Sequence, residues 1–88
     1  MPKSYLPAEE REELLREGGM NLVYLSESLD VGKAGDREAA WAWLALADVP
    51  AHSLMACKDN FGAGFIREMG FRTESADAVY GPGWLDAP

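Results

Sequence analysis

Apolar residues recur along this chain at the spacing of a helix face, and glycine or proline interrupts the pattern between segments. The clearest segment is Asp36–Asp48, DREAAWAWLALAD, which is closed by Val49-Pro50. Asp36 suits the N-cap position, because its carboxylate can accept hydrogen bonds from the free N–H groups of the first turn. A helix that is apolar on nearly all sides is either central in a fold or shared with a partner, and we expect the central position.

The inward face of this helix is predicted from helical spacing. Its members are Ala40, Leu44 and Ala47, with Trp41 at the margin and Trp43 and Leu46 on other sides.

A first helix is predicted near the start of the chain, after an irregular arm of residues 1–6. Pro7 suits the first helical position, where its missing N–H costs nothing. The helix is expected to run to about Glu17 and to stop at Gly18-Gly19, since paired glycines commonly end a helix.

A second helix is predicted between these glycines and Gly32. Its apolar face repeats at three- and four-residue steps through Leu22, Leu25 and Leu29. The polar residues Glu27, Ser28 and Asp30 fall largely outside that face.

Residues 50–69 keep a helical apolar pattern that Gly62 and Gly64 interrupt. Each internal glycine costs about 1 kcal/mol relative to alanine. We therefore expect either a kink near residues 60–64 or two helices, at 50–59 and about 62–69.

A last short helix is predicted over residues 74–80, with Gly81-Pro82 as its stop. Trp84 follows within a C-terminal tail, residues 82–88. Because a terminus is ordered only when something ties it down, we expect this tryptophan to pack back on the fold.

These elements predict an all-α fold, a compact bundle of four to five short helices in a single domain over residues 1–88. The segments 36–48 and 50–69 are expected to form a central αα-hairpin. This pair resembles one unit of a helical-repeat protein of the tetratricopeptide or Sel1 kind, through Gly35-Asp36, Ala39-Ala40, Trp41 and Pro50. No second copy follows at a fixed period and such solenoids need about three repeats, so we assign no family.

The net charge is −7, from 15 acidic and 8 basic residues. Such a surface repels phosphate groups, which disfavours direct binding to nucleic acid or to anionic membranes. It is compatible with a basic protein partner. The first ten residues contain no apolar stretch of a secretory signal, the longest apolar run is too short for a membrane span, and the single cysteine suits a reducing compartment. We expect a cytoplasmic protein.

The side chains that usually carry catalysis or bind metal are scarce. His52 and Cys57 are the only histidine and cysteine, and they lie five positions apart, roughly 140° around a helix. Zinc sites need several such ligands, and DVGKAGDREAAW lacks the acids of a calcium loop. NFGAGFIREMG lacks both the third glycine of a dinucleotide loop and a preceding strand. We therefore predict no catalytic, metal or cofactor-binding residues.

The resulting functional hypothesis is a non-enzymatic regulatory or interaction module that binds another protein. One alternative is an inhibitor of the phage or mobile-element type, whose acidic surface blocks a nucleic-acid-binding protein such as a defence nuclease. A second is a small accessory subunit of an enzyme complex, with His52, Cys57 and Asp59 as the groups to test. Monomer and homodimer both stay open.

Candidate partner-binding residues fall into two kinds. The first is a row of glutamates at helical spacing, which Arg11 and Arg16 dilute: Glu9, Glu10, Glu12, Glu13 and Glu17. The second is apolar: Trp43, Leu46, Phe71 and Trp84. In so short a chain these apolar residues also suit a core or a packed tail, which is the favoured interpretation.

Overall fold

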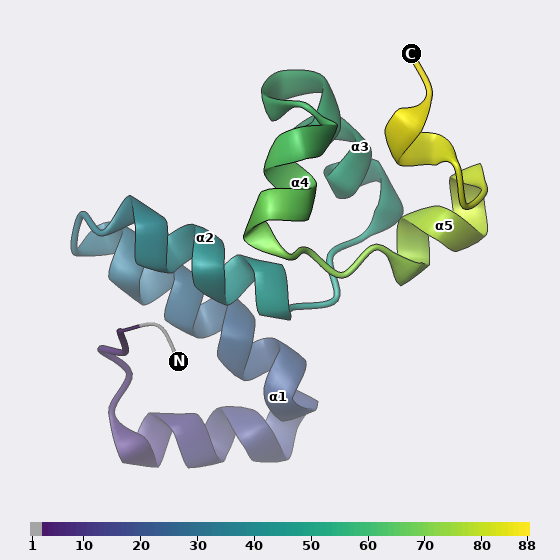
Figure 1. Ribbon diagram of the computed structural model, residues 1–88. Coiled ribbons are helices and arrows are strands. Elements are labelled where there is room, and N and C mark those ends of the chain that lie inside the picture. Colours follow the sequence, from purple (N-terminus) through teal and green to yellow (C-terminus); the bar gives the residue numbers. More distant parts are fainter. Residues whose placement is uncertain (1–2) are drawn as a thin grey trace. The chain divides into compact units, whose positions relative to one another are not determined.

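The computed structural model describes residues 3–88, and this part of the chain forms five α-helices and a short 3-10 helix, without a strand. The elements are α1 (Ala8–Lys33), α2 (Arg37–Leu46), α3 (Ala51–Phe61), α4 (Ala63–Met69), α5 (Glu74–Tyr80) and the 3-10 helix η1 (Trp84–Asp86) (Figure 1). The predicted all-α class is confirmed. The chain divides into two compact units, the first ending at Ala47 and the second beginning at Asp48.

Helix α1 is bent at Gly19, which has φ 70° and ψ −165°. This conformation is essentially restricted to glycine, because a Cβ would strain it. We call residues 8–18 the first arm and residues 20–33 the second arm of α1; Figure 1 shows them meeting at the bend. The predicted interruption at Gly18-Gly19 is thus confirmed.

Helix α2 packs against the second arm of α1 and forms the core of the first unit. Val31, Ala39 and Trp43 are buried there, and Tyr24 packs beside them with its ring centroid 6.1 Å from that of Trp43. Asp36 caps α2 as predicted, accepting a 3.0 Å hydrogen bond from the Ala39 N–H. The helical hairpin of this unit is therefore made by α1 and α2, not by the predicted pair 36–48 and 50–69.

The predicted inward face of α2 is also corrected. Ala47 is buried as predicted, but Ala40 and Leu44 are only half-buried, and Ala39 and Trp43 are buried in their place. Ala39 and Trp43 lie four residues apart, on one face of the helix, and this face meets α1. Spacing could not choose among the faces, since a helix apolar on all sides offers several.

In the second unit, α3 and α4 are separated by Gly62, which has φ 90° and ψ 160°. The sequence left open one kinked helix or two helices, and the structure confirms two helices. Helix α3 packs against both α4 and α5. The side chains of Leu54, Ile66 and Ala76 are all buried here.

The C-terminal tail is tied to the second unit through Trp84, which is only 3% exposed. Its indole Nε1 donates a 2.8 Å hydrogen bond to Asp77 on α5. The ammonium of Lys58 on α3 donates to the carbonyls of Trp84 and Ala87, at 2.5 and 2.7 Å. These contacts place the end of the chain against α3 and α5.

Candidate binding groove on the first unit

A groove of about 430 Å³ lies between the two arms of α1. Its lining residues are Leu6, Glu10, Glu13, Leu14, Glu17, Ser26, Leu29, Asp30 and Lys33. Four come from the first arm and four from the second, and on each arm they follow the spacing i, i+3, i+4, i+7 of a single helix face. The bend at Gly19 therefore turns two helix faces of the same chain toward one space.

The walls of this groove combine apolar and acidic side chains. Leu6, Leu14 and Leu29 supply the apolar part, and Leu29 is 65% exposed. Around them stand four carboxylates and a single basic group, the ammonium of Lys33. A leucine this exposed beside a hollow leaves apolar surface that a bound segment could cover.

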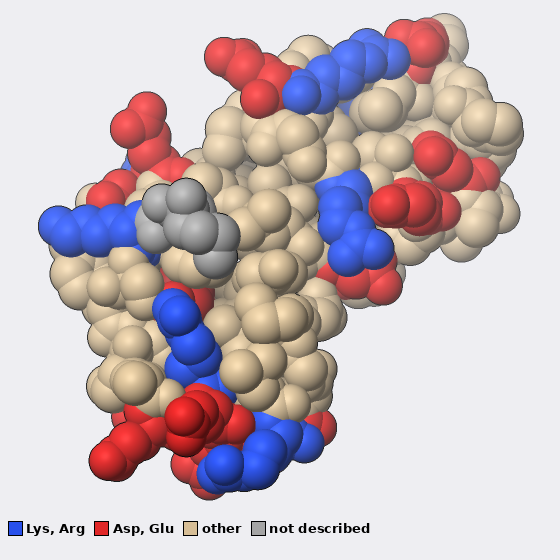
Figure 2. Space-filling view, turned by 60° about the horizontal axis from the view of Figure 1, so that its bottom comes forward, with Lys and Arg blue, Asp and Glu red and all other residues tan. Residues whose placement is uncertain are grey.

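Acidic and basic side chains are interspersed on the surface. On the face drawn in Figure 2, acidic side chains form separate small groups with lysine or arginine side chains beside them. The net negative charge is therefore not spread as one continuous acidic face in this view.

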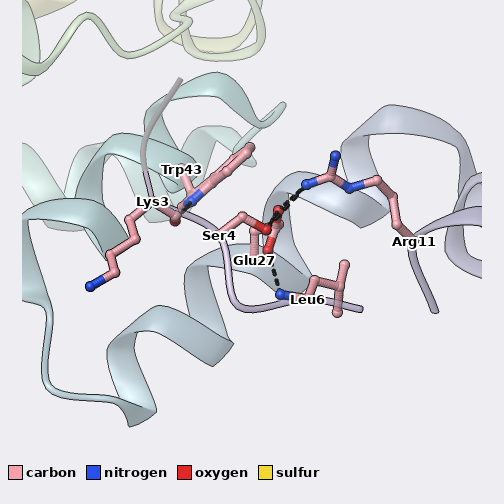
Figure 3. A network of polar contacts seen from close by, with 6 residues as sticks. All are labelled: Lys3, Ser4, Leu6, Arg11, Glu27 and Trp43. Carbon is pink, nitrogen blue, oxygen red and sulfur yellow. Dashed lines mark hydrogen bonds and ion pairs between the residues drawn. The ribbon is translucent and has the colours of Figure 1, made fainter. Parts of the chain in front are cut away.

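The carboxylate of Glu27, which is fully buried, holds the N-terminal segment and the first arm against the second arm (Figure 3). Its Oε2 accepts hydrogen bonds from the Ser4 hydroxyl and from the Arg11 guanidinium, both at 2.6 Å. Its Oε1 accepts from the Leu6 backbone N–H at 3.3 Å. Because Leu6 lines the groove and Arg11 belongs to the first arm, one side chain helps to position both walls. We call Glu27, Arg11, Ser4 and the Leu6 N–H the Glu27 clasp.

This burial overturns the expectation that Glu27 lies outside the buried face. A glutamate with no partner would not be buried, because removing a bare carboxylate from water costs several kcal/mol. Here an ion pair and two further hydrogen bonds offset that cost. The partners lie 16 to 23 positions away in the sequence, so no local pattern could have revealed them.

A second tie fixes the N-terminal segment to α2. The buried Trp43 side chain donates from its Nε1 to the Lys3 carbonyl at 2.7 Å (Figure 3). Residues 3–6 are thus irregular in conformation but are held at both Lys3 and Leu6.

The predicted row of glutamates is divided by the structure. Glu10, Glu13 and Glu17 line the groove, where Asp30 of the second arm joins them. Glu9 and Glu12 are exposed on the same arm but do not line it. Sequence spacing identified the acidic arm, whereas the contribution of Asp30 and the leucines became visible only once the bend brought the arms together.

The predicted apolar candidates differ in burial: three are buried and one is exposed. Trp43, Phe71 and Trp84 are 1%, 8% and 3% exposed, so their indole and phenyl rings belong to cores and present no surface to a partner. The favoured interpretation, a core or a packed tail, is thus confirmed for these three residues, and the surface role also considered for Trp43 and Trp84 is wrong. Leu46 is 37% exposed and stays available as a contact residue.

The groups suggested for an enzyme subunit all lie on α3. His52 and Asp59 are exposed, and Cys57 is half-buried. Burial raises the pKa of the Cys57 thiol, which lowers the fraction of reactive thiolate at neutral pH. Within residues 3–88, no three His, Cys, Asp or Glu side chains are grouped so that they could share a metal ion.

Comparisons of this chain with protein-family models, with curated proteins and with solved structures found no match. In the described part of the chain, no helix has the combination of length and apolarity required to cross a lipid bilayer. The groove and the Glu27 clasp are therefore the features from which a function can be inferred.

Proposed function

We propose that this chain acts without catalysis, as a cytoplasmic regulatory or interaction module that binds another protein through the groove of the first unit. The observation that carries the proposal is the lining of two facing helix surfaces, with exposed Leu29 beside it. Grooves of this kind, walled by helices and partly apolar, are a recurring way to receive a segment of a partner.

The test is affinity purification from the source cells with three forms of the protein: wild type, Leu29→Ser and Leu15→Ser. Both leucines are exposed residues of α1, but only Leu29 lines the groove, so Leu15→Ser is the matched control. A protein that co-purifies with the wild type and the control but is lost with Leu29→Ser supports the proposal. If the set of bound proteins is the same for all three forms, the groove is not the binding surface.

A second candidate is inhibition of a nucleic-acid-binding protein by charge. It is favoured by the exposure of all five glutamates on the first arm of α1, which places negative charge along one short helix. The variant with Glu→Gln at Glu9, Glu10, Glu12, Glu13 and Glu17 should then lose binding to the basic partner. Persistent binding of that variant removes this candidate.

A further inference from the structure

Resting on the proposed function, we infer the chemistry of the occupant: a short cationic amphipathic segment of a partner protein. Its apolar side chains lie against Leu14 and Leu29, and its lysine or arginine side chains face the carboxylates on the two arms. This assigns the groove a class of ligand as well as a role.

Charge selects a cationic ligand over a neutral or acidic one. Glu10, Glu13 and Glu17 stand on the first arm and Asp30 on the second, so both arms contribute carboxylates to the lining. Lys33 is the single positive group among the lining residues. A bound segment that carries positive charge beside apolar side chains matches this mainly acidic and partly apolar lining, and an acidic segment would be repelled.

Size selects a segment rather than a whole folded surface. The volume of about 430 Å³ lies in the lower part of the range typical of small-ligand sites, roughly 300–1,000 Å³. Such a space holds a few side chains. The contact is therefore made by one or two helical turns or a short extended stretch, whose apolar side chains enter while its cationic groups stay at the rim.

The same observations disfavour a second copy of this chain as the occupant. Each copy has a net charge of −7, so a second copy would approach a negative groove with like charge.

The experiment titrates the isotope-labelled full chain with a short synthetic Lys/Leu amphipathic peptide and follows the backbone amide resonances. A peptide in which every Lys is replaced by Gln is the ligand control. The protein variants are a triple Glu→Gln at Glu10, Glu13 and Glu17, and a matched triple Glu→Gln at Glu9, Glu12 and Glu68, which are exposed residues outside the groove. Both triples change the net charge equally, so they separate a local effect from a general one.

The expected result is that resonances on both arms of α1 shift with the Lys peptide. The affinity should fall about tenfold in the groove triple, since each exposed ion pair contributes modestly, and about twofold or less in the matched triple. Equal losses in the two triples, or no binding of the Lys peptide, overturn the inference. Equal binding of the Gln peptide also overturns it but leaves the proposed function standing, because the groove would then select apolar segments regardless of charge.

Discussion

The guanidinium of Arg11 donates a 2.6 Å hydrogen bond to the carboxylate of Glu27, joining the two arms of α1 across the bend at Gly19. The Glu27 side chain is fully buried, whereas that of Arg11 is 40% exposed. Because of this difference in burial, removing either side chain has a different consequence. Removing the buried carboxylate leaves Ser4 and the Leu6 N–H without their acceptor, while removing Arg11 leaves a buried charge without its counterion.

We predict that Glu27→Leu lowers the free energy of unfolding by about 1–3 kcal/mol, because three part-buried hydrogen bonds lose their common acceptor. Glu27→Gln should cost about half as much, since an amide oxygen can still accept from one donor. Urea unfolding followed by circular dichroism measures both. Glu38→Gln, at an exposed position of α2, is the control and should change little.

A double-mutant cycle of Arg11→Met and Glu27→Gln then isolates the ion pair. The effects of the two single changes should be coupled by about 1 kcal/mol or more, as for residues in one hydrogen-bonded network. Additive effects would mean that Arg11 does not stabilise the buried carboxylate.

The bend itself is open to test at Gly19. Gly19→Ala should destabilise the chain by about 1–3 kcal/mol, since φ 70° with ψ −165° is strained for any residue with a Cβ. Gly64→Ala is the matched control: Gly64 lies within α4 and an added Cβ would meet nothing within 4 Å, so it should stabilise by about 0.5–1 kcal/mol. Thermal unfolding of both variants decides the matter. A neutral or stabilising Gly19→Ala would mean that α1 does not bend there.

Lys58 is predicted to secure the C-terminal tail. Lys58→Met keeps an apolar stem but removes the donor to the Trp84 and Ala87 carbonyls, so the backbone amides of residues 84–87 should exchange with solvent several-fold faster. Hydrogen-exchange mass spectrometry measures this, with Lys33→Met as a control in the other unit. Unchanged protection would show that the contacts of Trp84 with Asp77 and of Asp86 with Arg67 retain the tail without Lys58.

The thiol of Cys57 should react slowly. Burial raises its pKa, so at a given pH the folded protein contains less thiolate than a free cysteine does. Alkylation by iodoacetamide should therefore be slower in the native protein than in the urea-unfolded chain, and its pH profile should have a higher midpoint. A faster native reaction with a lower midpoint would indicate an activated thiol and would revive the enzyme-subunit hypothesis.

The breaks in the helices are more predictable from the sequence than the inward faces of the helices. Gly19 and Gly62 mark interruptions in otherwise helical patterns, and glycine has a local physical reason to be there. The inward position of Trp43 is not predictable from spacing, because α2 is apolar nearly all round and its inward face is set by contact with Val31. The choice depends on tertiary packing, which spacing within one helix does not contain.

The groove, too, was only partly predictable from the sequence. The acidic character of the first arm was visible in Glu10, Glu13 and Glu17, but the groove needs Leu29 and Asp30 from the second arm. Glu27 was least predictable, since a glutamate is rarely buried and its partners are distant in sequence. Only the folded chain supplies that information.

In the folded protein the Glu27 clasp holds the two arms of α1 together and so forms the groove. This arrangement is tested most directly by nuclear Overhauser effects between the Leu6 amide proton and the Glu27 γ protons in the free protein. We expect these cross-peaks, together with a loss of sequential helical contacts at Gly19. Their absence, with helical contacts continuing unbroken through Gly18, Gly19 and Met20, would mean a straight α1 with no groove.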